Sequence, residues 1–172
     1  GQILSQEILD IPTHGTFNVH ASLLPKHRGS APIAWAIMQG DKEAGVPTMV
    51  TFRGIDNGDM LLKAATPIQT GETTAELTER LSHIGADLLI ETVKQLEAGT
   101  LVRTPQNEAE MTYDPMLSKE MGIIDWTMTA QEIVNRVHGL NPWPGCSTAM
   151  AGGRLKILRA ATTVGSGAPG EI

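Results

Sequence analysis

The first 99 residues mix two hydrophobic periods, the two-residue alternation of strands and the longer repeat of helices. Short β-rich runs at 15–20, 46–52 and 60–66 predict three strands. Between the second and third runs lies Gly54-Ile55-Asp56-Asn57-Gly58-Asp59, in which Asn-Gly predicts a turn. Strands that alternate with helices are typical of an α/β layer fold, so we predict that class for this region.

Three helices are predicted in the same region from their caps and apolar spacing. Ser5 precedes a short helix over 6–9, and Ser30 is the expected N-cap of a helix that ends at Gly40. The third helix begins at a capping box and ends at Gly99. Its box is Thr73-Thr74-Ala75-Glu76, and its buried face holds Leu77, Leu81, Ile84, Leu88 and Leu96.

The remaining residues predict a linker and a smaller second unit. Residues 100–122 lose the apolar periodicity and hold two prolines, so we expect a linker that lies over a surface. A second capping box, Thr129-Ala130-Gln131-Glu132, opens a helix through Val137. Two strands, 147–150 and 155–160, follow it and are joined by a Gly-Gly turn. The predicted units are therefore 1–99, a linker over 100–122, and 123–172.

Composition and charge limit the class of function. The 172-residue chain has a formal net charge of −6, which disfavours a tight, non-specific nucleic-acid binder because such proteins usually present a basic surface. No apolar run approaches the roughly 18–20 residues that cross a bilayer, and no secretion signal is visible. Cys146 is the only cysteine, which fits a reducing compartment because no internal disulfide can form.

Asn18 and His20 are the first candidates for chemistry. They lie two residues apart on the first predicted strand, so both side chains point to one face. Near a strand end they would reach the crevice in which open α/β sheets bind ligands. An amide donor and an imidazole proton together suit a developing oxyanion on a carbonyl group. The pair also fits a structural role in which both side chains bond to a loop, and this alternative stays open.

Asp56, in the predicted turn, extends this pair. A carboxylate beside His20 orients the ring and favours its protonated form. The alternative is that Asp56 and Asp59 only shape the turn around Asn57-Gly58. Transfer of an acyl group to a neutral amine needs an oxyanion donor, a proton shuttle and a carboxylate, and it needs no protein nucleophile. Asn18, His20 and Asp56 supply these three groups.

Two longer motifs resemble the signatures of a known family. Asn18-Val19-His20-Ala21-Ser22-Leu23-Leu24-Pro25-Lys26-His27-Arg28-Gly29 resembles the signature of the folate-dependent formyltransferases, and Gly54-Ile55-Asp56-Asn57-Gly58-Asp59-Met60 resembles their second motif. The resemblance implies a Rossmann-like formyltransferase domain followed by a β-barrel domain of the oligonucleotide-binding (OB) type. It implies that the catalytic residues are Asn18, His20 and Asp56, and that the residues helping to bind the folate donor are Ser22, Leu23, Leu24 and Pro25.

The residues after 110 indicate one branch of this family. Residues 111–120, 122–126 and 141–145 resemble the enzymes that act on methionyl-tRNA, and the resemblance covers essentially the whole chain. It implies formyl transfer from 10-formyltetrahydrofolate to the amino group of initiator methionyl-tRNA, in support of translation initiation in a bacterium or an organelle. We expect no metal, no membrane and no obligate protein partner, and a location in the cytoplasm or an organellar matrix.

Members of this family are much longer than 172 residues. We therefore expect a fragment that lacks the first part of the Rossmann-like domain and the end of the barrel. Two other functions remain open. A formyltransferase acting on an amino sugar nucleotide would use the same three residues, although residues 111–126 argue against it. A non-catalytic tRNA-binding piece would keep the motif as scaffold, although the acidic net charge argues against it.

Other conspicuous residues have structural explanations. The remaining histidines have no ligand-like spacing, and His27 is expected to be a solvated loop side chain. The eight methionines are expected to fill the core, and Cys146 to be small and partly buried. Four basic residues fit either a strip facing tRNA phosphates or an ordinary solvated surface. These are Arg136, Arg154, Lys156 and Arg159.

Overall fold

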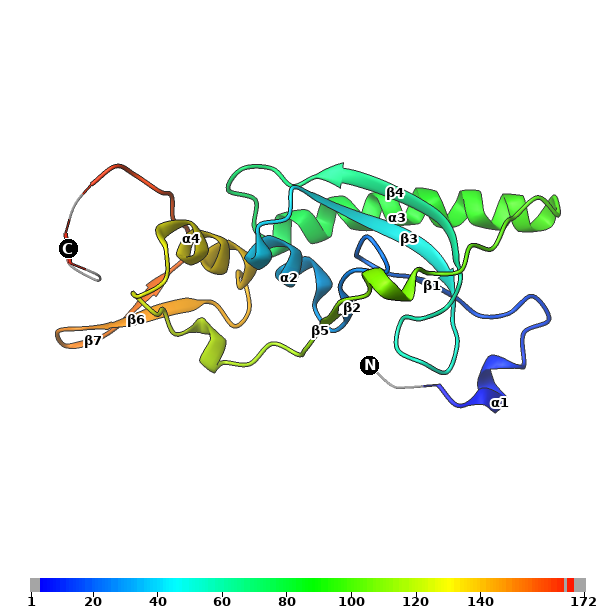
Figure 1. Cartoon of the computed structure of the whole chain (residues 1–172), viewed down its shortest axis with the longest axis horizontal. Helices are drawn as coiled ribbons and strands as arrows, with labels where there is room; N and C mark the ends of the chain where they lie inside the picture. Colours follow the sequence, from blue (N-terminus) through cyan, green and yellow to red (C-terminus); the bar gives the residue numbers. More distant parts are fainter. Residues whose placement is uncertain (1–3, 166, 169–172) are drawn as a thin grey trace.

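The computed structural model of the chain describes residues 4–165 and 167–168. Its helices and strands, in chain order, are α1 (Gln6–Leu9), β1 (Phe17–Val19), β2 (Arg28–Gly29), α2 (Pro32–Gln39), β3 (Glu43–Val50), β4 (Met60–Pro67), α3 (Thr74–Glu97), the 3-10 turn η1 (Glu108–Glu110), β5 (Tyr113–Asp114), the 3-10 turn η2 (Glu120–Gly122), α4 (Ala130–Gly139), β6 (Cys146–Met150) and β7 (Gly153–Ile157). The molecule is elongated, with α3 along one flank and the unit of α4, β6 and β7 at one end (Figure 1).

Three strands form an antiparallel sheet in the order β1-β3-β4. The central strand β3 is buried from Ala44 to Val50, because it has a neighbouring strand on each side and α3 against one face. Leu77 and Leu81 of α3 pack there with Val46 and Ile37. Strands and helices in layers confirm the predicted α/β class, although the described strands of this sheet pair only in the antiparallel sense.

The predicted helices are present, and the sequence located most of their ends. Both capping boxes form, so the side chains of Thr73 and Thr129 accept from the backbone three residues on. The N-cap predicted for α2 is wrong, because Ala31 occupies that position with a left-handed φ of 57° and no side-chain cap. Ser30 instead donates its backbone N–H to the Asp114 carbonyl at 3.0 Å, so pairing with β5 determines where α2 starts.

Two predicted turns differ from the observed ones. Asn57-Gly58 does not form a tight two-residue turn, since the longer loop 51–59 separates β3 from β4. Gly58 is nevertheless required, because a Cβ there would collide with the Val50 carbonyl oxygen. In the C-terminal hairpin, Met150 pairs with Gly153, so the turn residues are Ala151 and Gly152 rather than the two glycines.

The predicted linker 100–122 contains short structural elements. It holds η1, β5 and η2, and Thr104 pairs with Met60 through two backbone hydrogen bonds of 2.8 and 2.9 Å. β5 pairs in parallel with β2, so Tyr113 and Asp114 lie against the signature loop (Figure 1). The sequence does not predict these contacts, because the backbone groups of 100–122 pair with segments that are distant in the sequence.

The second unit has its own small core of Ile124, Val137, Leu140 and Cys146. Cys146 is fully buried rather than partly buried, and this burial raises the pKa of its thiol. The unit is joined to α3 by a 2.6 Å hydrogen bond from the Thr74 hydroxyl to the carbonyl of Gly139. Within residues 4–165 and 167–168, no helix is long and apolar enough to cross a membrane.

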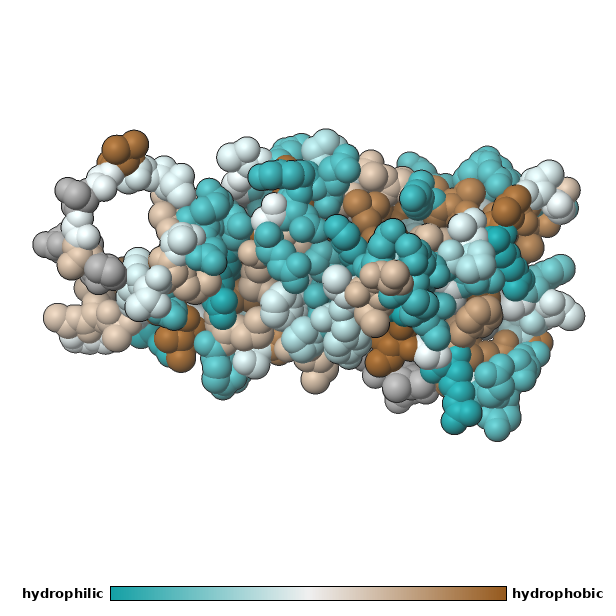
Figure 2. All heavy atoms as spheres, in the orientation of Figure 1, coloured by the Kyte–Doolittle hydropathy of each residue, from teal (hydrophilic) through white to brown (hydrophobic). Residues whose placement is uncertain are grey.

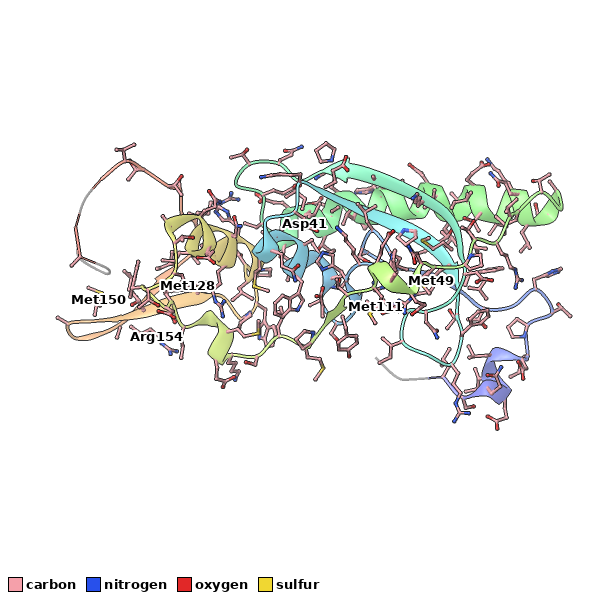
Figure 3. The ribbon with its side chains drawn as sticks, viewed as in Figure 1. Asp41, Met49, Met111, Met128, Met150 and Arg154 are labelled. Carbon is pink, nitrogen blue, oxygen red and sulfur yellow. The ribbon has the colours of Figure 1, made fainter. Side chains whose placement is uncertain are left out.

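Several methionines and other apolar residues lie on the surface rather than in the core. Met49 is buried in the sheet, but Met111 and Met150 are half exposed, so the expectation that the methionines fill the core is only partly correct (Figure 3). Apolar side chains also gather toward the C-terminal end of α3, where Leu89 and Ile90 are exposed (Figure 2).

The capping box of α3 leads to a prediction about acid stability. Hydrogen bonds from Thr73, and the guanidinium of Arg159 beside it, lower the pKa of Glu76 from 4.5 to about 2. A carboxyl whose pKa is depressed on folding stabilises the fold above its unfolded value, and this contribution is lost as the pH falls through the folded value. Glu76→Gln should therefore lower the melting temperature at pH 7, and the difference from the wild type should vanish near pH 2.

The control for this prediction is Glu79→Gln, on the same helix and also exposed. It should leave the melting temperature unchanged at both pH values, because its side chain lies outside the capping box. A difference between Glu76→Gln and the wild type that stays constant from pH 7 to pH 2 would contradict the assignment.

Candidate active site

Strand β1 carries Asn18, and His20 follows directly after its last residue, Val19. Val19, which lies between them, points toward α3, where a Cβ on Gly85 would come within 2.9 Å of its Cγ1. Alternation along the strand turns Asn18 away from α3, and the predicted common face of Asn18 and His20 stays a prediction. The backbone N–H of His20 donates to the Pro47 carbonyl at 3.1 Å, so pairing with β3 continues through this residue.

A cavity of about 470 Å³ lies beside β1. Asn18 and Asp56 both line it, together with Phe52 from the 51–59 loop, Ser30 from the signature region and Tyr113 from β5. The cavity thus brings together a side-chain amide and a carboxylate that lie far apart in the sequence. Apolar walls with a few convergent polar groups are typical of small-molecule sites.

His20 lies beside Asp56, which lines this cavity. The imidazole is buried, with Nδ1 3.7 Å from Asp56 Oδ1, and its Nε2 donates to the carbonyl of His27 at 3.1 Å. The other carboxylate oxygen of Asp56 accepts the N–H of Gly29 at 2.9 Å. His20 is not itself among the residues that line the cavity. The structure therefore pairs His20 with Asp56 and places Asn18 with Asp56 at the cavity wall.

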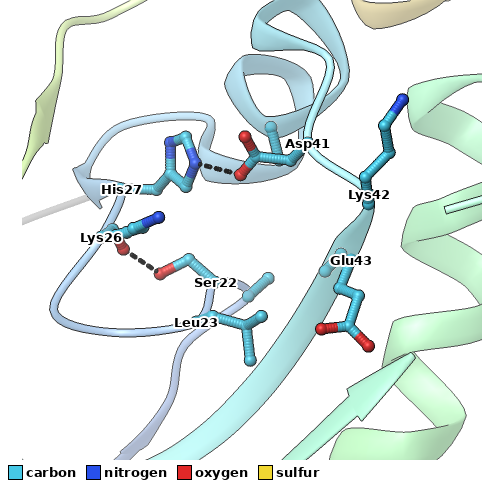
Figure 4. A pocket seen from close by; sticks show the side chains of 10 residues that line it. Ser22, Leu23, Lys26, His27, Asp41, Lys42 and Glu43 are labelled. Atoms are coloured by element: carbon cyan, nitrogen blue, oxygen red, sulfur yellow. Dashed lines mark hydrogen bonds and ion pairs between the residues drawn. The ribbon is translucent and has the colours of Figure 1, made fainter. Parts of the chain in front are cut away.

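The four residues expected at the folate donor lie on a different part of the loop. Ser22 donates its hydroxyl to the Lys26 carbonyl at 2.7 Å, and Leu24 and Pro25 are buried. Ser22 and Leu23 line a second cavity of about 230 Å³, shared with Asp41 (Figure 4). The structure does not bring these residues to the cavity of Asn18, and their role in folate binding stays a prediction.

The expectation that His27 is solvated is wrong. Its side chain is only 3% exposed, and its ring lies between two carboxylates. Nδ1 is 2.7 Å from Asp114 Oδ2, and Nε2 is 2.9 Å from Asp41 Oδ2 (Figure 4). Burial raises the pKa of Asp114, while the hydrogen bond from His27 acts in the opposite direction. This cluster connects the signature loop to β5 and to the turn after α2. No sequence motif could indicate it, because the two carboxylates are distant from His27 in the sequence.

Arg28 is the second residue of the signature that the sequence left without a role. It is buried, and its guanidinium donates to Gln106 Oε1 and to both carboxylate oxygens of Glu108. Gln106 in turn donates to two carbonyl groups of the 51–59 loop, those of Asp56 and Gly58. The segment before β5 therefore contacts both the signature loop and the loop that carries Asp56.

The basic residues of the second unit divide into two pairs. Arg136 donates to the Met121 carbonyl, and Arg159 forms an ion pair with Glu76. Arg154, labelled in Figure 3, and Lys156 are exposed and lie two residues apart on β7, so they face the same side of the hairpin. In the part of the chain that the structure describes, no group of three or more His, Cys, Asp or Glu side chains gathers in a way that could hold a metal ion.

Comparison with protein families identifies both parts of the chain. A family model described as formyl transferase matches residues 1–93, and one described as formyl transferase, C-terminal domain, matches residues 116–172. The chain belongs to the formyl transferase family. This result confirms the family indicated by the signature motifs, and the fold of a formyltransferase domain followed by its C-terminal domain.

Curated relatives of this formyl transferase are similar along its whole length. Proteins named methionyl-tRNA formyltransferase from Citrifermentans bemidjiense and Geotalea uraniireducens are each 51% identical to it over 172 residues. The matches cover 100% of this chain but 54% and 55% of those proteins. The chain therefore spans about half the length of the curated relatives that it matches.

Solved structures share the fold at much lower identity. A HypX structure from Aquifex aeolicus in complex with tetrahydrofolic acid has a TM-score of 0.74 at 23% identity, over 91% of this chain and 28% of that one. An N-formyltransferase from Helicobacter canadensis, solved with folinic acid and dTDP-3-aminofucose, has a TM-score of 0.72 at 22% identity, over 83% of this chain and 53% of that one. These likenesses support the assigned fold.

Proposed function

We propose that this formyl transferase moves a formyl group from 10-formyltetrahydrofolate to the α-amino group of initiator methionyl-tRNA. The observation that carries the proposal is the pairing of His20 with Asp56 beside a cavity that Asn18 and Asp56 line. The choice of acceptor rests on the 51% identity to proteins named methionyl-tRNA formyltransferase over the full chain. Solved formyltransferases titled as acting on sugars, or solved with an amino sugar nucleotide, share the fold at 19–22% identity, which gives weaker support to an amino sugar acceptor.

In this reaction the neutral amine attacks the formyl carbon of the donor. A C–N bond forms to the amine, the carbonyl π electrons move to oxygen, and a tetrahedral oxyanion results. When the oxyanion collapses, the bond between the formyl carbon and N10 of the folate breaks. One proton leaves the amine, and one reaches N10. The protein must therefore stabilise a negative charge on oxygen and carry a proton between two nitrogens.

The proposed roles follow from the donors that each side chain offers. The amide of Asn18 donates to the oxyanion, and the His20 imidazolium stabilises the same charge and shuttles the proton. Because Nε2 of His20 bonds the His27 carbonyl, Nδ1 is the nitrogen that faces Asp56. Asp56 orients and charges His20 and collects the proton that leaves the amine.

We also propose a role for each segment of the chain. Residues 1–99 carry the catalysis, 100–122 link the units, and 123–172 begin the OB-like domain. The residues proposed to help bind the folate donor are Ser22, Leu23, Leu24 and Pro25. Arg154 and Lys156 are exposed on one side of β7 and would face tRNA phosphates. We propose a location in the cytoplasm or an organellar matrix.

The acceptor is tested by offering two amines in the presence of 10-formyltetrahydrofolate. The full chain is assayed by itself and in a chimera that replaces the matching segment of the C. bemidjiense relative, which is 51% identical to it. We expect formylation of initiator methionyl-tRNA and none of a dTDP-amino sugar. Formylation of the sugar alone would favour the alternative acceptor, and tRNA binding without turnover in either form would favour a non-catalytic role.

Asp56→Asn should lower kcat by roughly 10²–10³-fold, because the amide cannot charge His20 or accept a proton. It keeps the size of the side chain and an oxygen that can accept the Gly29 N–H, so the melting temperature should change little. Asp59→Asn is the matched control, since it alters the same loop without contacting His20. Equal kcat values for Asp56→Asn and wild type, measured by single-turnover formylation, would remove Asp56 from the mechanism.

A further inference from the structure

The side-chain amide of Gln106 forms hydrogen bonds at both of its ends. Its Nε2 donates to the Asp56 carbonyl at 2.8 Å and to the Gly58 carbonyl at 2.7 Å. Its Oε1 accepts from Arg28 Nη2 at 2.8 Å and from Nε at 3.1 Å. Both donors and both acceptor lone pairs of the amide are therefore used, so its orientation is determined by the contacts.

The 51–59 loop needs such a contact because its backbone is strained at the functional residue. Asp56 has a left-handed φ of 47°, a conformation that costs a non-glycine residue about 1 kcal/mol or more. The loop has no regular pairing of its own beyond its ends, where Thr51 donates to Thr16 and Val50 to Asp59. The two carbonyls that accept from Gln106 belong to the residues before and after Asn57. The amide therefore holds the loop on both sides of the turn.

Gln106 is held in place from its other side. Arg28 is 5% exposed and belongs to the signature loop that also contains Gly29, whose N–H binds the Asp56 carboxylate. The nearby bridge between Thr104 and Met60 fixes the backbone two residues before Gln106. Hydrogen bonds thus connect the signature loop, through Arg28 and Gln106, to the backbone of Asp56.

We propose that Gln106 is a positioning residue that sets the distance between the Asp56 carboxylate and His20 by clamping the Asp56 and Gly58 carbonyls. The inference rests on the proposed function, because it gives Asp56 and His20 their catalytic roles. The carboxylate lies 3.7 Å from Nδ1, and a displacement of about 1 Å from such a geometry can lower a rate by roughly 10²-fold. Gln106 itself contacts no reacting atom.

Gln106→Glu tests the two ends of the side chain separately, because it changes only the end that contacts the loop. A glutamate keeps the oxygen that accepts from Arg28 but loses the NH₂ group that holds the loop. Glu108→Gln is the matched control, because Glu108 binds the same guanidinium, is 67% exposed and has no contact with the 51–59 loop. The variants are made in the full chain and in the chimera, and kcat, the KM for acceptor and the melting temperature are measured for each.

We expect Gln106→Glu to lower kcat by roughly 10–100-fold with KM changed less than about 3-fold. Glu108→Gln should leave kcat within about 2-fold of the wild type. In an Asp56→Asn background, Gln106→Glu should have no further effect, because its target has already been disabled. The inference is overturned if Gln106→Glu keeps wild-type kcat, or if it lowers kcat by the same factor in both backgrounds.

A second readout does not depend on turnover. Hydrogen exchange of the full chain should be faster over residues 51–59 in Gln106→Glu than in wild type or Glu108→Gln. Equal exchange in all three proteins would overturn the positioning role whatever the activity. If the wild type formylates neither acceptor, the proposed function fails, and this exchange measurement still decides whether Gln106 clamps the loop.

Discussion

Replacing His20 with alanine is expected to lower kcat by roughly 10²–10⁴-fold, the largest loss of activity for a single substitution in this chain. The variant removes both the cation that stabilises the oxyanion and the group that carries the proton. Neither Asn18 nor Asp56 can substitute, because an amide is not charged and a carboxylate repels the oxyanion. Single-turnover formylation in the chimera measures the chemical step directly.

The control must separate chemistry from folding, since His20 is buried and bonds the His27 carbonyl. His20→Gln keeps a side-chain NH₂ that can donate to this carbonyl, so it should retain the melting temperature and still lose turnover. His83→Ala, at an exposed position on α3, should have no effect on either property. Turnover close to that of the wild type in His20→Gln would remove His20 from the mechanism.

His27→Leu is expected to have the largest effect on stability. The substitution leaves Asp114, which is 2% exposed, without its 2.7 Å partner. Breaking a buried ion pair by removing one member costs about 3–5 kcal/mol, because the remaining charge stays desolvated. We expect the lower part of this range, since burial already raises the pKa of Asp114 and protonation relieves part of the cost. Urea unfolding of the full chain gives the free energy of unfolding.

A second substitution tests the cause of this loss. Asp114→Asn in the His27→Leu background removes the buried charge, so it should restore part of the free energy of unfolding. His14→Leu is the matched control at an exposed histidine and should change the free energy by no more than about 0.5 kcal/mol. If Asp114→Asn lowers the stability of the His27→Leu variant further, an uncompensated carboxylate is not the cause.

Local patterns in the sequence predicted the features that depend on near neighbours. The capping boxes at Thr73 and Thr129 form as predicted because both partners lie within one helical turn. The two motifs also indicated the formyl transferase family, which the family matches confirm.

Contacts between distant segments could not be predicted in this way. The sequence predicts a solvated His27, because its partners Asp41 and Asp114 follow 14 and 87 residues later and no motif connects them. Gln106 lies within the predicted linker over 100–122, and no sequence pattern indicates that its amide holds the Asp56 loop. No period or spacing relates such residues, because chain folding alone brings them together.

The sequence by itself determined the α/β class, most helix boundaries, the family, and Asn18, His20 and Asp56 as candidates. Only the tertiary structure decided how these candidates are held: His20 by the His27 carbonyl and Asp56, and Asp56 by Gly29 and Gln106. The physical reason is that a motif specifies which donors and acceptors are present. Their distances and burial depend on the segments that pack around them, and for this site residues 104–114 are one of those segments.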